Sequence, residues 1–202
     1  MNDLFTIGHS IHPLNDFLEL LKKRAIDYVI DVRSIPYSEH ASDYNKDKIK
    51  LYLNNHGISY AHMGKYFGAR QEDPSLYSFD KKRDKFYLDF RKVQESSNFN
   101  IGFENILKGA MQFRIAFMCT EKNPIDCHRA IMVGNAFFKK GYAVKHILED
   151  GHIKEHIELN KDLLDKYFPD RFQGDFFQRP DEKQLIEDAY RQRNIEIGYT
   201  LP

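Results

Sequence analysis

Short apolar segments alternate with amphipathic segments along the first 150 residues of the chain. Residues 4–7 form an apolar run that ends at Gly8, and residues 28–32 form a second run. Between them, residues 13–24 place leucines and a phenylalanine at the spacing of one helix face. This order predicts a strand, a helix and a second strand, which is the repeating unit of a parallel sheet.

The alternation continues to residue 148. The pattern predicts helices over residues 46–55, 103–111 and 127–140, and strands over residues 58–62, 114–119 and 142–148. Residues 65–98 interrupt this pattern with Gly68, Pro74 and a charge run over residues 80–85. We therefore predict an inserted loop in this region, followed by a helix over residues 83–93.

The predicted fold class is an open three-layer α/β sandwich with a mostly parallel central sheet and a helical, aromatic C-terminal extension. Residues 1–150 form its core domain, with the insertion at residues 65–98. Residues 151–202 form the extension, with helices over residues 154–167 and 181–193. A loop between these helices contains four phenylalanines, namely Phe168, Phe172, Phe176 and Phe177. We expect the extension to pack on the core.

Composition narrows the class of protein. The 202 residues carry 30 basic and 30 acidic side chains, which argues against a protein whose main role is to bind duplex DNA and leaves a local basic groove open. No apolar run approaches the roughly 20 residues of a membrane span, and the first residues lack the pattern of a secretory signal. We therefore expect a cytoplasmic protein without a membrane partner, whose two cysteines are free thiols.

Polar and ionisable residues follow three of the predicted strands. In an open α/β sheet, ligands bind beyond the carboxyl ends of the parallel strands. We predict four catalytic residues at these ends, namely Glu121, Asp31, His9 and Cys127. We predict five substrate-binding residues beside them, namely Ser10, Arg33, Ser34, His128 and Arg129.

Two features of this set favour an anionic ligand. Arg33 and Arg129 can each bind a phosphate or carboxylate group through two hydrogen bonds. Cys127 lies at the start of the predicted helix over residues 127–140, where the helix dipole stabilises an anion or a thiolate. This helix start is therefore a candidate site for a phosphate group or for a reactive thiol.

The same residues also have structural interpretations. Asp31 can pair with Arg33, His9 can be a hydrogen-bonded loop residue, and Ser10 can cap the following helix. Cys119 lies inside an apolar strand, where a cysteine is usually a packing residue. Its spacing to Cys127 matches no structural zinc motif, and no fourth ligand is evident. We therefore predict no metal site, and the sequence identifies no cofactor.

Aromatic and basic residues mix between residues 60 and 92. The aromatic members are Tyr60, His62, Tyr66 and Phe67, and the basic members are Lys81, Arg83, Lys85, Arg91 and Lys92. Such a mixture is typical of surfaces that bind single-stranded nucleic acid, and it also occurs on ordinary solvated helices. Nucleic acid therefore stays open as a partner.

Four blocks of sequence resemble the signature of one bacterial family. The blocks are residues 6–10, residues 31–38, residues 118–121 with residues 127–129, and residues 141–147. In this order they resemble the Domain of Unknown Function 488 family, although Phe67-Gly68-Ala69 replaces its usual Leu-Gly-Gly turn and Thr120 replaces an alanine. The resemblance implies an α/β fold and a site built from His9, Arg33, Glu121, Cys127, His128 and Arg129. It implies no particular reaction.

The residues are consistent with three functions. The first is an enzyme, a hydrolase or transferase, that acts on a phosphate-bearing substrate such as a nucleotide or a nucleic-acid end. The second is a thiol-dependent enzyme that uses Cys127 as its nucleophile. The third is a module that binds a ligand or nucleic acid without catalysis. The partner expected first is a small-molecule anion or a nucleotide, and the sequence does not indicate an oligomeric state.

Overall fold

A six-stranded sheet forms the centre of the molecule in the computed structural model, which describes residues 3–172 and 181–201. Its strand order is β3-β2-β6-β1-β7-β8. The strands are β1 (Leu4–Gly8), β2 (Tyr28–Asp31), β3 (Ser59–His62), β6 (Ile115–Cys119), β7 (Val144–Ile147) and β8 (Ile153–Glu155). All neighbouring strands pair in parallel except β8, which is antiparallel to β7. The predicted mostly parallel sheet is therefore confirmed.

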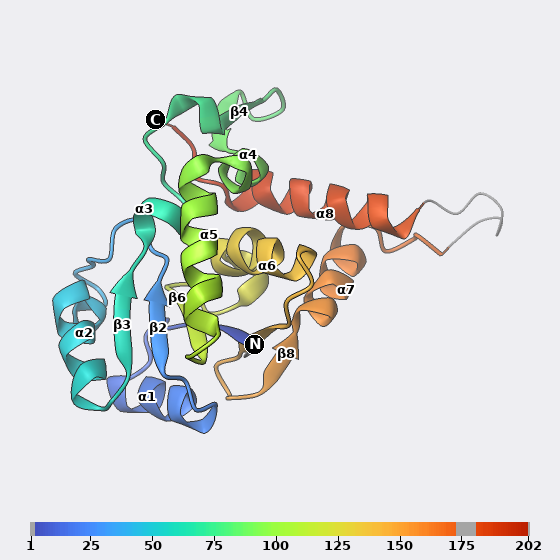
Figure 1. Ribbon diagram of the computed structural model, residues 1–202. Helices are drawn as coiled ribbons and strands as arrows, with labels where there is room; N and C mark the ends of the chain where they lie inside the picture. Colours follow the sequence, from blue (N-terminus) through green and yellow to red (C-terminus); the bar gives the residue numbers. More distant parts are fainter. Residues whose placement is uncertain (1–2, 173–180, 202) are drawn as a thin grey trace.

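Helices cover both faces of this sheet (Figure 1). Helices α1 (Leu14–Lys23) and α2 (Lys46–Asn55) pack on one face, and α5 (Ser97–Ala110), α6 (Asn135–Lys139) and α7 (His156–Tyr167) pack on the other. Side chains alternate along β6, so Met118 joins the core under α1 while Phe117 joins the core under α5 and α6. The Phe117 ring lies 5.4 Å from that of Phe137. The three-layer α/β fold is confirmed.

The inserted region differs from its prediction. Residues 77–80 form strand β4 and residues 85–88 form strand β5, which pair as an antiparallel hairpin. The helix predicted over residues 83–93 was therefore wrong over residues 83–89, and only residues 90–93 of it are helical. The charge run is the turn of the hairpin, where Asp84 adopts φ +53°, and helix α4 (Phe90–Glu95) begins after Asp89, whose carboxylate accepts hydrogen bonds from the first helical N–H groups. Aromatic residues, which are enriched in strands, favour β4 and β5: Tyr77 and Phe79 lie in β4, and Phe86 and Tyr87 lie in β5.

The segment after β6 also differs from a regular helix. It begins with a 3-10 turn (Pro124–Asp126) capped by Asn123, continues through Cys127 in extended conformation, and then forms a π-helix (Arg129–Gly134) before α6. The regular helix predicted over residues 127–140 was therefore wrong. The Gln94 amide donates to the Met132 carbonyl, which provides a partner for one π-helical carbonyl. Single π-helical turns often occur at functional sites.

Helix α8 (Glu182–Ile197) joins the C-terminal extension to the rest of the protein. Tyr190 is buried against the main core, and Asn194 exchanges hydrogen bonds with the backbone of Leu88 and Phe90. The division into a core domain and an extension stays a prediction. Phe176 and Phe177 of the predicted aromatic loop lie outside the described residues. None of the described helices has the length and apolar character needed to cross a membrane.

The remaining elements are short. They are the helix α3 (Gly64–Phe67) and two further 3-10 turns (Ser42–Tyr44 and Pro74–Leu76). Helix α3 contributes Phe67 to the core, where its ring packs edge-on against Phe99 of α5 at 5.1 Å. The turn at residues 42–44 brings Tyr44 over the carboxyl end of the sheet, beside His9.

A buried chain of hydrogen bonds connects the sheet to α8. The Thr6 hydroxyl lies 2.8 Å from Nδ1 of His146, and Nε2 of His146 lies 3.0 Å from Nδ1 of His156. Nε2 of His156 lies 2.9 Å from the Tyr190 hydroxyl, which donates to Asn160. Burial lowers the pKa of both histidines, and it lowers that of His156 to about 3. Both rings are therefore neutral near pH 7. Each neutral ring has one N–H group, which it can donate within this series of hydrogen bonds.

Candidate functional site

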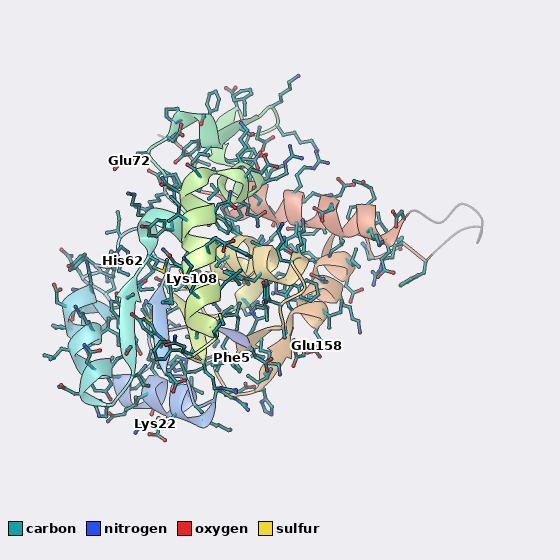
Figure 2. All side chains as sticks on the ribbon, viewed as in Figure 1. Phe5, Lys22, His62, Glu72, Lys108 and Glu158 are labelled. Carbon is teal, nitrogen blue, oxygen red and sulfur yellow. The ribbon has the colours of Figure 1, made fainter. Side chains whose placement is uncertain are left out.

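The loops after β1, β2 and β6 meet at one edge of the sheet. Strand β6 lies between the other two, with Cys119 opposite Gly8 of β1 and Met118 opposite Asp31 of β2. His62, at the end of β3, marks the same edge (Figure 2). The strand order therefore places the polar residues that follow these three strands beside one another.

Four reactive side chains form a cluster at the end of β6, which we call the Cys–His cluster: Cys119, Glu121, Cys127 and His128. The Cys119 and Cys127 thiols lie 3.1 and 2.8 Å from the same Glu121 oxygen, Oε2. Nδ1 of His128 lies 3.7 Å from the Cys119 sulfur and 4.0 Å from the Cys127 sulfur. One ligand atom from each residue lies within 4.8 Å of all the others, a spacing that could hold a metal ion.

Burial shapes the electrostatics of the Cys–His cluster. Cys119, Cys127 and His128 are buried, while Glu121 is exposed. Burial raises the pKa of Cys119. The Glu121 residue is exposed as a whole, but its carboxylate packs against the buried thiols, and burial of this group raises its pKa. Burial opposes ionisation of Cys127 as well, but hydrogen bonding with Cys119 and the charge of Arg129 outweigh it and lower the pKa of Cys127. Cys127 is therefore the first of the two thiols to ionise.

A hydrogen bond from Nε2 to the backbone fixes the orientation of the His128 ring. Nε2 lies 3.0 Å from the backbone carbonyl of Val32, which can only accept a hydrogen bond. Nε2 therefore carries a proton, and in the neutral ring the lone pair of Nδ1 faces the two sulfurs. The extended backbone at Cys127 and the start of the π-helix at Arg129 place this ring next to Val32.

Arg129 is fully buried behind the cluster. Its guanidinium donates to the backbone carbonyls of Glu121 and Lys122, at 2.5 and 3.1 Å, while its Nε has no partner among the described residues. A side chain on Gly8 would overlap the Glu121 carbonyl, so glycine permits the close approach of this loop to β1. Arg129 and Gly8 therefore hold the Glu121 loop against the sheet.

A second group of polar residues, the Asp31–Arg33 network, lies at the ends of β2 and β1. Arg33 donates to the Asp31 carboxylate, with the closest contact at 2.6 Å, and also to the Tyr44 carbonyl at 2.8 Å. The Tyr60 hydroxyl donates to the same carboxylate at 2.7 Å. Asp31 is 0% exposed and Arg33 is 5% exposed. The guanidinium of Arg33 is therefore engaged inside the protein.

His9 completes the Asp31–Arg33 network. Its ring stacks on Tyr44 at 4.2 Å, its Nδ1 lies 2.9 Å from the Ser10 carbonyl, and its Nε2 lies 3.2 Å from Nη1 of Arg33. Burial, and next the charge of Arg33, lower the pKa of His9 to about 4. The neutral ring therefore donates from Nδ1 and accepts from Arg33 through Nε2.

The two serines of the predicted site have backbone roles. Ser10 adopts φ +46°, and its N–H donates to the Thr120 carbonyl. The Ser34 hydroxyl accepts a hydrogen bond from the backbone of Arg70 at 2.8 Å. Ser10 therefore turns the chain after β1, and Ser34 connects the loop after β2 to the inserted region. Their predicted role in substrate binding stays a prediction.

Comparison with known proteins gives one match. The family described as Domain of unknown function DUF488 matches residues 13–135, which is more than half of the chain. The chain belongs to this family. The matched residues contain the second and third signature blocks, whereas the first and fourth blocks lie outside them. No curated protein and no solved structure matches this DUF488 protein.

A pocket of about 630 Å³ opens beside the cluster in this DUF488 protein. Glu121 lines it together with residues from the β6–π-helix segment and from the end of β7, namely Lys122, Asn123, Pro124, Asp126, Leu148, Glu149 and Asp150. The Lys122 ammonium forms an ion pair with Glu149, and Asp126 forms one with Arg193 of α8. Acidic groups outnumber basic groups in this lining.

The site of the DUF488 protein contains three residues that were not among the predicted catalytic and substrate-binding residues. Cys119 was expected to be a packing residue, and it is indeed buried in the core, but its sulfur also contacts Glu121. Tyr44 and Tyr60 bind the Asp31–Arg33 network from the turn at residues 42–44 and from β3. The position of Cys119 at the last residue of β6, two residues before Glu121, was the signal available for it.

Proposed function

We propose that this DUF488 protein is an enzyme of the hydrolase or transferase class, with the Cys–His cluster as its active centre and Glu121 as its general base. One observation carries the proposal. Glu121 is exposed and lines the pocket, while its carboxylate contacts two buried thiols. A carboxylate held in this way can take a proton from water or from a substrate hydroxyl at the pocket surface, and the oxygen so activated can attack an electrophilic atom of the substrate.

The lining of the pocket supports a neutral or cationic substrate. Its acidic members exceed its basic ones, and Lys122 is already paired with Glu149. The predicted phosphate-bearing substrate would need Arg33 or Arg129, and both guanidinium groups contact partners inside the protein. We therefore propose a small neutral or cationic molecule in place of the phosphate-bearing substrate expected from the sequence.

The alternative of a thiol nucleophile receives less support from the contacts. Cys127 is 1% exposed, and it is not among the residues that line the pocket. A nucleophilic sulfur must reach the substrate directly. In this proposal Cys127 therefore positions Glu121 and does not attack the substrate. The third alternative, binding without catalysis, is an outcome of the experiment below.

The experiment is a turnover screen of the purified protein against chromogenic esters, amides and phosphoesters, with neutral, cationic and anionic members of each class. We expect turnover of a neutral or cationic member, with kcat lowered about 100-fold or more in Glu121→Gln. Glu104→Gln, an exposed acid on α5, is the matched control and should keep full activity. Turnover that survives in Glu121→Gln, or absence of turnover across the screen, would contradict the proposal. Ligand binding without turnover would favour a binding module.

A further inference from the structure

We propose that Cys119, Glu121, Cys127 and His128 bind one zinc-type divalent metal ion. This inference rests on the proposed function, because it concerns the same centre: Glu121 would bind the ion through Oε2, the oxygen that contacts both thiols, and its other carboxylate oxygen would act as the general base. The four ligand atoms lie within 4.8 Å of one another. In a tetrahedral zinc site with Zn–S bonds of about 2.3 Å and Zn–N or Zn–O bonds of about 2.0 Å, the ligand atoms lie about 3.3–3.8 Å apart. The S–N distance from His128 to Cys119, 3.7 Å, lies within this range, and the S–N distance to Cys127, 4.0 Å, is slightly longer.

The carboxylate is the ligand that must move. Its Oε2 lies 3.1 and 2.8 Å from the two sulfurs, which is closer than two ligands of one zinc ion lie. These short contacts are hydrogen bonds from the thiols, and the protons leave when both sulfurs become thiolate ligands. An outward shift of Glu121 by less than about 1 Å then gives the tetrahedral spacing. Glu121 is the exposed member of the cluster, so it has room for this movement.

The chemistry of the donor set selects the class of metal. Two thiolates and one imidazole are ligands for zinc and similar borderline or soft ions. Magnesium and calcium require mostly oxygen ligands, and the cluster offers these ions one carboxylate. The site therefore favours zinc, with cobalt as its spectroscopic substitute.

The surroundings of His128 match those of a metal ligand. Metal-binding histidines usually donate their second N–H group to a carbonyl or carboxylate, which fixes the ring and exposes the other lone pair to the metal. His128 does so with the Val32 carbonyl, at 3.0 Å. The Arg129 N–H group also points to the Cys127 sulfur, at 3.5 Å, as expected for an amide that stabilises a thiolate.

The buried charge of Arg129 gives an independent reason for an anionic centre. Its guanidinium is 0% exposed, and within the described residues its hydrogen bonds go to backbone carbonyls, not to a carboxylate. A buried cation without a counter-charge is costly. A zinc ion with two thiolates and one carboxylate carries a net charge of −1, which offsets the charge of Arg129. The arginine that the sequence suggested as a phosphate ligand is then the electrostatic partner of the metal centre.

The test is a cobalt and zinc titration of the full-length protein after chelator treatment under reducing conditions. We expect one cobalt ion per chain with thiolate-to-cobalt absorption in the near ultraviolet, and zinc should displace it. Cys119→Ser, Cys127→Ser and His128→Gln should each weaken binding by roughly 100-fold or more, and Glu121→Gln by about tenfold. His62→Gln, a histidine at the same edge of the sheet, is the matched control and should bind normally.

A second measurement guards against variants that fail to fold. Zinc should raise the melting temperature of the wild-type protein and of His62→Gln, because it binds the native state, and it should leave the melting temperature of folded Cys127→Ser unchanged. Cobalt spectra without the thiolate band, or equal binding by wild type and Cys127→Ser, would overturn the metal site. If the protein binds no cobalt or zinc but shows turnover that is lost in Glu121→Gln, the metal site is overturned and the proposed enzyme is kept. If it binds the metal through the four residues but turns over no substrate, the metal site is kept and the proposed enzyme is overturned.

Discussion

Acid should destabilise this protein steeply, because His146 and His156 are buried as neutral rings. The pKa of His156 falls from 6.5 to about 3 on folding, mainly through burial. The unfolded chain therefore binds one more proton at this residue between these two pH values, so the free energy of unfolding falls as pH falls. One pKa unit corresponds to about 1.36 kcal/mol. His156 alone should thus lower stability by about 2 kcal/mol between pH 7 and pH 5.

The perturbation that isolates this effect is His156→Gln. Glutamine can accept from His146 and donate to Tyr190 as the histidine does, but it cannot titrate. The assay is urea unfolding of wild type and variant at pH 7 and pH 5. The variant should be less stable at pH 7 because its packing is less complete. At pH 5 the difference in the free energy of unfolding between wild type and His156→Gln should be about 2 kcal/mol smaller than at pH 7.

The control is His40→Gln, which removes an exposed histidine. The free energy of unfolding of His40→Gln should stay within about 0.5 kcal/mol of the wild-type value at both pH values, as for other surface substitutions. If His156→Gln and wild type lose the same stability between pH 7 and pH 5, the assignment of a buried neutral ring at His156 is refuted. A wider difference at pH 5 would mean that the ring is stabilised in its charged form.

Three further predictions concern single positions. Phe117→Ala, at a fully buried ring between the sheet and α6, should lower the free energy of unfolding by about 3–5 kcal/mol in urea unfolding, and a loss below about 1 kcal/mol would contradict the packing described. Gly8→Ala should lower the melting temperature because its Cβ meets the Glu121 carbonyl, and an unchanged melting temperature would show that the loop can move away. Arg33→Gln should lower the free energy of unfolding by about 3–5 kcal/mol in urea, since it removes the buried partner of the Asp31 carboxylate, and a neutral outcome would contradict the importance of this pair.

Much of the fold follows from local sequence pattern. Helix α2 has the same bounds as its prediction, and the core strands lie within a few residues of theirs, because apolar periodicity is strong in these segments. The hairpin over residues 77–88 was missed because its turn is a charge run that is also typical of a solvated helix. The π-helix was missed because its extra residue depends on tertiary contacts such as that of Gln94 with Met132.

The candidate site shows where local pattern stops being informative. Strand ends indicated the residues to consider, but the strand order decides which of them meet. The strand order brings the loops after β1, β2 and β6 together, and within them Glu121 groups with Cys119 and His128, whereas His9 groups with Arg33. Nothing in the spacing of Cys119 and Cys127 reveals that a 3-10 turn folds the chain back and places both sulfurs on one carboxylate.

The position of β6 also has a consequence for how the chain reaches its native state. Strands β1 and β2 are made first, yet neither can pair with the other, because each pairs with β6, which begins at Ile115. During synthesis, the backbone N–H and C=O groups on one side of each strand have no partner strand until β6 leaves the ribosome. Closing such long-range parallel pairs is slow. The molecule should therefore fold late and cooperatively around β6, and chains interrupted before Ile115 should aggregate.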